Sequence, residues 1–294
     1  MLADRFEEHR PHLRGVAYRM LGSLAEADDA VQDTWMRVSR AGASEVENLR
    51  GWLTTITARV CLTILRSRSV RREESLEVHV PDPVISAGEA LQPEEEALLA
   101  DSVGLALQVV LDTLGPAERM AFVLHDMFQL PFDEIAPLLG RSSAAVRQLA
   151  SRARRRVKGA EPTVPDPDLG RQREVVDAFF AAARRGDLDA LVAVLDPGVT
   201  LRIDGGTALP AASMAICGAD AVARQTLTGL ASTLQVAQLH PTLVNGSAGM
   251  ILTIRARPLT VMGFSIVNGK VAEINAIAEP ERVGTITRSV LNKG

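Results

Sequence analysis

Residues 132–158 read FDEIAPLLGRSSAAVRQLASRARRRVK, in which a short and largely apolar helix is followed by a strongly basic one. Gly140 is suited to end the first helix, and Ser142 or Ser143 can cap the second. Two helices joined by a tight turn are typical of a helix-turn-helix. The spacing predicts one buried stripe on the second helix, made of Val146, Leu149, Ala150, Ala153 and Val157.

Polar and basic side chains of the second helix lie off this stripe. An arginine fork can pair with two acceptors on guanine, glutamine can do so on adenine, and a basic cluster suits phosphates. Residues 135–160 hold seven basic side chains and no acidic one, which favours DNA contact over a merely solvated face. The predicted DNA-contacting set is Ser143, Arg147, Gln148, Ser151, Arg154, Arg155 and Lys158.

Charge is segregated along the rest of the chain, although the formal net charge is only -4. Residues 1–72 carry a net charge of +3, residues 73–134 carry -13, and residues 135–160 carry +7. Two basic segments therefore flank a strongly acidic one. Such segregation says more about partners than the whole-chain charge does, so a nucleic-acid partner is not excluded.

Shifts in composition divide the chain into five parts. We expect a helical domain over residues 1–72 and a second one, containing the helix-turn-helix, over 97–160. Residues 73–96 combine prolines with acids and no base, which predicts an acidic, self-repelling linker. Residues 161–168 contain three prolines and predict a stiff connector, and residues 169–294 form a third domain.

The third domain has an α+β pattern. Helical spacing covers residues 170–195 and 219–230, and Asn245-Gly246 and Asn268-Gly269 are strong hairpin signals. We expect two helices followed by a curved antiparallel sheet. The predicted strands are Val199–Ile203, Val236–Val244, Met250–Ala256, Leu259–Val267 and Val271–Ile277.

Several classes of protein are disfavoured. No apolar run approaches the roughly 20 residues that cross a bilayer, and acids stand near the N-terminus where a signal peptide would be apolar. We therefore expect a cytoplasmic protein with no membrane partner. Cys61 and Cys217 lie too far apart in sequence for a CxxC metal site, so each is expected to be a small buried hydrophobe. No metal or cofactor is expected.

Two features of the first domain are ambiguous when taken alone. An acidic stripe lies beside the apolar face of residues 27–38, and a solvated face explains it better than acid–base chemistry does. Trp52 lies near Arg59, Arg66 and Arg68, so it could stack on an unpaired nucleotide or simply belong to the core. The acidic stripe comprises Glu26, Asp28, Asp29 and Asp33, with Gln32 beside them.

Three ordered motifs resolve this ambiguity. They are AEADDAVQDTW at residues 25–35, NLRGWLTTITAR at 48–59 and LGPAER at 114–119, which leads into the helix-turn-helix. Together they resemble a bacterial RNA polymerase sigma factor of the extracytoplasmic-function class. More narrowly, the chain resembles the SigJ-type subgroup, which implies two all-α sigma domains followed by an α+β SnoaL-like cone domain of the nuclear-transport-factor type.

The resemblance implies roles for the motif residues. The acidic stripe (Glu26, Asp28, Asp29, Gln32 and Asp33) would dock on core RNA polymerase, and the basic helix of the helix-turn-helix would read the minus-thirty-five element of promoter DNA. The minus-ten element would be opened by a segment that holds an unstacked base. Its expected contacts are Asn48, Arg50, Trp52, Arg59, Arg66 and Arg68.

Residues outside the sigma domains also match the subgroup. The resemblance implies regulatory contacts between the linker, the Asp-Gly-Gly at 204–206 and the terminal motif EPERV at 279–283. His79-Val80 replaces the subgroup's tryptophan-leucine, and Pro280 alone is identical to its Asn-Pro-Asp-Lys-Leu motif. The expected regulatory set is Pro81, Asp82, Pro83, Asp204, Gly205, Gly206, Pro280 and Arg282.

A cone domain encloses an apolar pocket, which serves as an enzyme site or a ligand site in related folds. Asp204, Asp220 and His240 are candidate acid–base residues, but no nucleophile–base set accompanies them, so no catalytic residue is assigned. Regulation in cis is preferred, with a small-molecule ligand of the pocket left possible. One alternative is a ligand-sensing helix-turn-helix regulator, which leaves residues 26–35 and 48–59 without purpose. The other is a SnoaL-type isomerase fused to a DNA-binding module.

Overall fold

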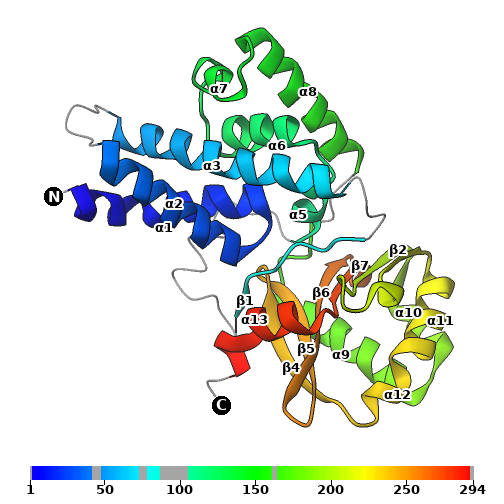
Figure 1. The fold of residues 1–294 in the computed structure, drawn as a ribbon. Helices are drawn as coiled ribbons and strands as arrows, with labels where there is room; N and C mark the ends of the chain where they lie inside the picture. Colours follow the sequence, from blue (N-terminus) through cyan, green and yellow to red (C-terminus); the bar gives the residue numbers. More distant parts are fainter. Residues whose placement is uncertain (1, 42–47, 73–77, 87–104, 161–163, 292–294) are drawn as a thin grey trace. The chain divides into compact units, whose positions relative to one another are not determined.

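The computed structural model describes residues 2–41, 48–72, 78–86, 105–160 and 164–291. They fall into two compact units, which are described separately. The first comprises Met1–Leu76, Pro93–Ser102 and Leu107–Pro162, and the second comprises Glu77–Gln92, Val103–Ala106 and Thr163–Gly294. Figure 1 labels the helices and strands in chain order.

The first unit begins with three long helices, α1 (Leu2–Leu21), α2 (Leu24–Ala41) and α3 (Leu49–Arg72). Trp35 packs on Phe6 with the ring centroids 5.0 Å apart. The predicted helical face of α2 is confirmed: Trp35 is half-buried, and the other members are almost wholly buried, namely Ala27, Ala30, Val31, Thr34 and Val38.

Shorter helices follow: α5 (Leu105–Asp112), α6 (Pro116–Phe122), a π-helical turn (Val123–Met127), α7 (Phe132–Leu139) and α8 (Ser143–Gly159). Arg119 of α6 is 1% exposed and joins these helices to α1. Its Nη1 donates to Oδ1 of Asp112 (2.8 Å) and its Nε donates to the carbonyl of Arg19 (3.1 Å). A buried arginine thus ties α1, α5 and α6 into one body.

The second unit is built on a seven-stranded sheet of order β1-β4-β5-β6-β7-β2-β3. The sheet is mixed, because β2 pairs with β7 in parallel, so the expectation of a purely antiparallel sheet is wrong. The pattern of hairpin signals shows only neighbours in sequence, whereas β2 and β7 are distant in sequence. The strands are β1 (Ile85–Ser86), β2 (Leu195–Asp204), β3 (Met214–Cys217), β4 (Gln238–Val244), β5 (Ser247–Ile254), β6 (Arg257–Val267) and β7 (Lys270–Ile277).

Tight turns with positive φ connect the antiparallel strands. Both predicted hairpins are confirmed, with φ of 49° and 80° at Asn245 and Gly246 and of 52° and 72° at Asn268 and Gly269. A third turn, which joins β5 to β6, has positive φ at Arg255 and Ala256, residues that favour this conformation far less than asparagine and glycine do.

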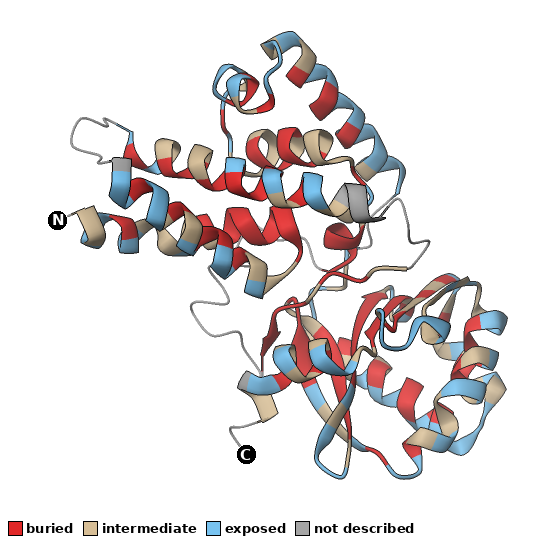
Figure 2. Ribbon diagram, in the orientation of Figure 1, coloured by how far each residue is buried: buried red, intermediate tan, exposed pale blue. Residues whose placement is uncertain are grey.

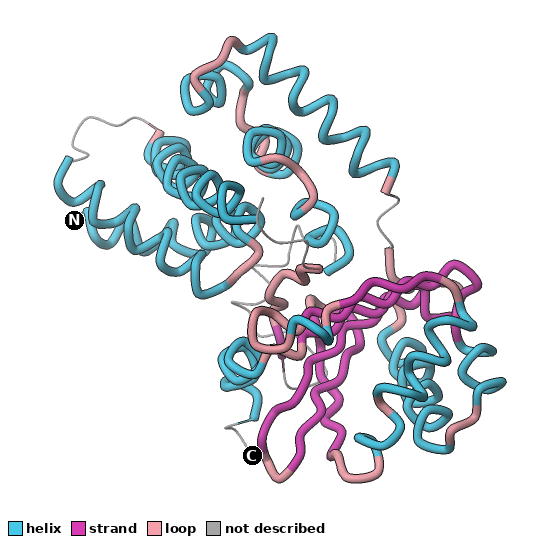
Figure 3. Tube along the Cα trace, turned by 45° about the vertical axis from the view of Figure 1, so that its right-hand side comes forward, coloured by secondary structure: helices cyan, strands magenta, loops and turns pink. Residues whose placement is uncertain are grey.

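The sheet is covered on both faces (Figures 1 and 3). Side chains alternate between faces, so Met250 and Leu252 join the core beneath the helices while Ile251 joins a second cluster on the opposite face. That second cluster contains Val80 of the linker and Val283 of α13 (Pro280–Leu291). The first face is covered by α9 (Leu169–Arg185), α10 (Leu188–Val194), α11 (Ala219–Gly229) and α12 (Ala231–Leu234).

Burial corrects one prediction about the cysteines. Cys61 lies in the core of α3, where burial raises the pKa of its thiol to about 12. Cys217 is exposed, because it occupies an outward position of β3, whose residues alternate between partial burial and exposure. In the part of the chain that Figure 2 colours by burial, the strands carry most of the buried residues of the second unit.

Candidate nucleic-acid interface and linker clasp

Helices α7 and α8 form the predicted helix-turn-helix. Gly140 ends α7 in the left-handed region, at φ 62°, and glycine adopts this conformation without steric cost. Ser142 is the N-cap of α8, and its side chain accepts a hydrogen bond from the Ala145 amide (3.3 Å). The predicted stripe is confirmed for Val146, Leu149, Ala150 and Ala153, which are buried, whereas Val157 is half-buried.

Acidic side chains of neighbouring elements form ion pairs with three arginines of α8. Glu118 of α6 pairs with Arg156 (2.8 Å) and with Arg152 (3.2 Å). Asp126, in the π-helical turn, pairs with Arg154 (2.5 Å). These ion pairs join α8 to its neighbours at the surface, and Arg154 belongs to them although the sequence placed it in the DNA-contacting set.

The other members of that set have different surroundings. Ser143 donates from Oγ to Asp133 (2.5 Å), and the Arg147 guanidinium lies over the Phe132 ring, 5.7 Å from its centroid. Four exposed residues recur at i, i+4, i+8 and i+11 and so share one helix face: Arg147, Ser151, Arg155 and Lys158. Gln148 is exposed beside them. This face is the basic surface of α8 that the ion pairs leave uncovered.

The acidic stripe of α2 is partly paired. Asp28 accepts from Arg14 (2.6 Å) and Asp33 from Arg37 (2.8 Å). Glu26 pairs with Arg68 of α3. Asp29 and Gln32 are exposed. The stripe therefore keeps a polar, acidic outer surface while its N-terminal end is joined to α3.

The segment from Asn48 to Arg68 forms the start and length of α3. Asn48 caps the helix by accepting a hydrogen bond from the Gly51 amide (2.9 Å), and a Cβ at Gly51 would lie 2.6 Å from the Asn48 side chain. Arg68 donates to the Leu21 carbonyl (2.8 Å), so it holds the bundle together. Trp52 is half-buried, and the other candidates are exposed: Arg50, Arg59 and Arg66.

Arg282 of α13 is the centre of a second site, in which the linker is held on the C-terminal domain. Its Nη2 donates to the Val80 carbonyl (2.6 Å), and its Nε and Nη2 donate to Oδ1 of Asp82 (2.9 and 2.6 Å). Its Nη1 donates to Oδ2 of Asp204 (2.7 Å). We call His79, Val80, Asp82, Asp204 and Arg282 the linker clasp.

Asp204, at the end of β2, is 2% exposed and receives further donors. Its Oδ2 accepts from the Val80 amide (2.8 Å) and lies 3.2 Å from Nδ1 of His79. Burial raises the pKa of Asp204, but His79, the Val80 amide and Arg282 together lower it well below its ordinary value. For Arg282 burial lowers the pKa, but the nearby carboxylates of Asp82 and Asp204 raise it by more, so the pKa of Arg282 lies above its ordinary value.

This electrostatic arrangement predicts a pH dependence. The lowered pKa of Asp204 in the fold stabilises the C-terminal domain at every pH above the ordinary aspartate value of about 3.9. That stabilisation is lost as the pH falls below this value toward the folded-state pKa. Urea unfolding followed by circular dichroism should therefore show stability falling between pH 5 and 2, and more steeply than in the Asp204→Asn variant. An equally steep fall in that variant would contradict the prediction, and Asp220→Asn, at an exposed site, is the control.

Close contacts explain why two glycines follow Asp204. A Cβ on Gly205 would lie 2.1 Å from the Leu209 carbonyl oxygen. Gly206 has a φ of 56°, and a Cβ there would meet the Glu279 carboxylate at 2.2 to 2.6 Å. The motif thus lets the chain turn tightly against the start of α13.

Burial of the linker extends beyond the clasp. Pro81 and Pro83 are buried, and β1 pairs with β4. Asn245 also holds the linker, and the sequence analysis did not predict this contact. Its side-chain Oδ1 accepts a hydrogen bond from the backbone amide of Val84 (2.7 Å), and its backbone amide donates to the Val84 carbonyl (2.8 Å). The only signal for this residue was its place in a hairpin turn. Pro280 is exposed and is the first residue of α13.

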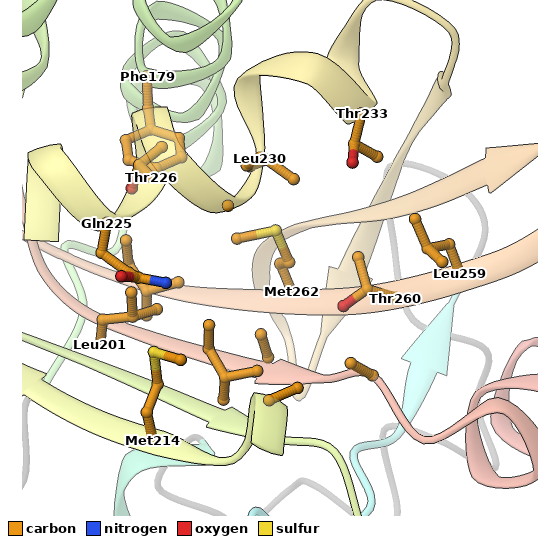
Figure 4. Close-up of a pocket in the computed structure, with 16 residues that line it drawn as sticks. Phe179, Leu201, Met214, Gln225, Thr226, Leu230, Thr233, Leu259, Thr260 and Met262 are labelled. Carbon is orange, nitrogen blue, oxygen red and sulfur yellow. The ribbon is translucent and has the colours of Figure 1, made fainter. Parts of the chain in front are cut away.

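A pocket of about 440 Å³ lies between α11, α12 and the strands of the same domain (Figure 4). None of the three acid–base candidates lines it. Asp204 is engaged in the clasp, Asp220 is exposed on α11, and Nε2 of His240 bonds to Thr253 (2.9 Å). The described residues contain no group of His, Cys, Asp or Glu suited to a metal ion, and none of their helices is both long and apolar enough to cross a membrane.

Comparison with known proteins identifies the family. Residues 5–71 match Sigma-70 region 2 and residues 104–157 match Sigma-70 region 4. The ECF RNA polymerase sigma factor SigJ of Mycobacterium tuberculosis is 38% identical over 293 residues, which cover 96% of this chain and 93% of that relative. The chain belongs to the ECF RNA polymerase sigma factors.

Further matches agree with this sigma-factor assignment. The crystal structure of M. tuberculosis SigJ has a TM-score of 0.75 and 35% identity, and the match covers 97% of this chain and 98% of that one. The probable sigma factor SigI of M. tuberculosis is 35% identical, with 92% of this chain and 91% of the relative covered. The Escherichia coli ferric citrate uptake sigma factor FecI is 33% identical, but over 49% of this chain and 82% of its own length.

The comparisons fix the biochemical class of this sigma factor. It binds core RNA polymerase and directs promoter-specific transcription initiation, as the two sigma domains imply, and the family is not catalytic. The predicted fold class is confirmed, with two helical sigma domains followed by an α+β domain. The relatives that cover the chain nearly throughout share its C-terminal domain as well as the sigma domains.

Proposed function

We propose that the C-terminal domain regulates this sigma factor in cis by holding the linker in the clasp. The observation that carries the proposal is the contact of one arginine, Arg282, with both Asp82 and the Val80 carbonyl. The linker lies in sequence between region 2, at residues 5–71, and region 4, at residues 104–157. Holding it restricts the positions that the two regions can take when they bind a promoter.

Covalent attachment supports this proposal. The linker and the C-terminal domain are parts of one chain, so the effective concentration of one for the other is high and even modest contacts are populated. The contacts here are stronger than that, because the clasp is a charge-assisted hydrogen-bond network, and beside it Val80, Ile85 and Val283 pack in one buried apolar cluster. The domain would therefore replace a separate inhibitory partner.

The finer residue roles also belong to the proposal. The acidic surface of α2 would contact core polymerase, chiefly through the exposed Asp29 and Gln32. The exposed arginines at the start of α3 and along it, together with Trp52, would engage the minus-ten element. The basic face of α8 would enter the major groove at the minus-thirty-five element. Because a sigma factor works on chromosomal DNA, the protein would act in the cytoplasm.

Run-off transcription with purified core polymerase tests regulation in cis. Removing residues 280–294 deletes Arg282 and releases the linker, so promoter-specific transcript should increase relative to the full chain. Removing residues 163–294 should also change output, because the whole regulatory domain is lost. Unchanged output from both truncated chains would contradict regulation by this domain, and absence of specific initiation by all three chains would contradict promoter recognition.

The basic face of α8 gives a separate prediction. Arg155→Gln should weaken binding of every promoter sequence and reduce the slope of log affinity against log salt by about 0.9, the contribution of one phosphate contact. Arg147→Gln should instead change the preference among sequences, by about 1–3 kcal/mol at one base pair. Electrophoretic mobility shifts over a series of promoter variants and salt concentrations measure both effects.

The control for these two variants is Arg184→Gln, which removes one exposed charge from α9 in the C-terminal domain. It should leave DNA binding unchanged. Equal effects of Arg147→Gln on all sequences would contradict a base contact at that position.

We further propose that the pocket of the C-terminal domain holds a small-molecule ligand. Its volume and its position within one domain support this, since small-molecule sites in proteins enclose roughly 300–1,000 Å³.

A further inference from the structure

The walls of the pocket indicate which chemical class of ligand it would take. Figure 4 shows helices α11 and α12 on one side and the strands on the other. None of the sixteen lining residues carries a charge. The bulky apolar side chains come from both sides and include Phe179, Leu201, Met214, Leu230, Met262 and Ile274.

Two of the three threonine hydroxyls in the wall are already used as donors, and the third, on Thr233, is an uncharged hydrogen-bonding group. Thr226 donates to the Val222 carbonyl (2.9 Å) and Thr260 donates to the Ile277 carbonyl (2.8 Å). An ionised ligand would lose its hydration here without meeting an opposite charge, which is strongly unfavourable. The pocket therefore selects against anions and cations.

Gln225 is the one lining residue with a side-chain amide. The Gln225 amide extends into the pocket in Figure 4 and makes no hydrogen bond to the part of the chain that the structure describes. An amide offers both a donor and an acceptor. It can therefore pair with a single hydroxyl, carbonyl or amine group on a ligand that is otherwise apolar.

Part of the wall belongs to the core of the domain, so this part of the pocket is preformed. Phe179 and Ile274 are fully buried, and Leu201 and Met262 are 4% and 5% exposed. The wall also includes the exposed Leu259, so the pocket of about 440 Å³ is open to solvent on one part and apolar along its buried part, which suits an apolar occupant.

We infer that the pocket binds a neutral, largely apolar small molecule that carries one hydrogen-bonding group facing Gln225. This inference rests on the proposed function in one respect, the assignment of the pocket as a ligand site. It is independent of the linker clasp.

A pair of fluorescent probes that differ in one charged group tests the ligand class on the full chain. N-phenyl-1-naphthylamine is neutral and carries one N–H group, whereas 1-anilinonaphthalene-8-sulfonate has the same rings and a sulfonate. We expect the neutral probe to bind saturably at one equivalent and the sulfonate to bind at least about tenfold more weakly. No saturable binding of the neutral probe, or equal binding of the two, would overturn the inference.

Variants place the probe in the pocket. Met214→Trp fills part of the cavity and should weaken binding of the neutral probe by at least about tenfold, while Val164→Trp adds the same ring at an exposed site and should not. Ala212→Trp, at a half-exposed lining position, is a second blocking variant if the first fails to fold. Undiminished binding by a folded blocking variant would overturn the inference. The transcription assays on truncated chains test regulation in cis separately.

Discussion

Replacing Arg282 with glutamine should release the linker and raise promoter-specific run-off transcription by about tenfold or more. The substitution removes the positive charge that pairs with Asp82 and Asp204. Because Asp204 is nearly fully buried, it is left as a buried carboxylate without this partner. Breaking such a pair by removing one partner costs about 3–5 kcal/mol, and each 1.4 kcal/mol is a tenfold change in an equilibrium. The docked state of the linker should therefore lose most of its population.

Amide hydrogen exchange reports the release directly. The Val80 amide donates to Asp204 and the Val84 amide donates to Asn245, so both should exchange much faster in the Arg282→Gln variant. Amides in the β5–β6 pairing should keep their protection, because the sheet remains folded. Arg288→Gln removes a charge from an exposed position on the same helix and is the matched control. Faster exchange without any change in transcription would separate the clasp from regulation and contradict the proposed role.

Replacing Arg119 with methionine should destabilise the first unit by about 3–5 kcal/mol. The side chains of Arg119 and Asp112 are 2% and 8% exposed, so the substitution leaves a buried carboxylate without its guanidinium. The carbonyl of Arg19 also loses a donor. Urea unfolding is readily followed by fluorescence, because the only tryptophans of the chain are Trp35 and Trp52, both in this unit.

A double variant separates the lost pair from the lost packing. Arg119→Met combined with Asp112→Leu removes both charges, so it should be more stable than Arg119→Met alone. If the double variant is no more stable than the single one, the ion pair is not what holds α1, α5 and α6 together. Arg14→Met, which removes an exposed partner of Asp28, should cost less than about 1 kcal/mol.

The periodic spacing of apolar residues was sufficient to predict the helices that bury one face. The stripe of α2, the pair α7 and α8 and the turns at Asn245 and Asn268 are local patterns, in which the spacing and the special φ of a few residues determine the structure. β1 and β3 were missed, because two and four residues are too few to show a clear alternating pattern. The parallel β2–β7 pair was missed because it joins segments that are distant in the sequence.

In the candidate sites, too, local patterns were predicted from the sequence, whereas contacts between distant elements were not. Helical spacing predicted the basic face of α8, but not the use of Arg154 in an ion pair with Asp126, because that depends on how the π-helical turn packs on α8. Asp82, Asp204 and Arg282 were associated through family motifs, and the structure places them within hydrogen-bond distance. His79 was noted only as a departure from those motifs, yet it lies against Asp204.

The parallel pairing of β2 and β7 has a structural consequence. Strands that run in the same direction finish at the same edge. Here Ile203 and Ala278 line the pocket, whereas Asp204, which follows Ile203, bonds to the linker, and Glu279, which follows Ala278, lies near Arg282 of the clasp. The Ala278 amide donates to the Asp204 carbonyl (2.8 Å), which locks the two strand ends together. Neighbouring residues at these strand ends thus belong to the pocket lining and to the clasp, so the two sites share one short stretch of backbone.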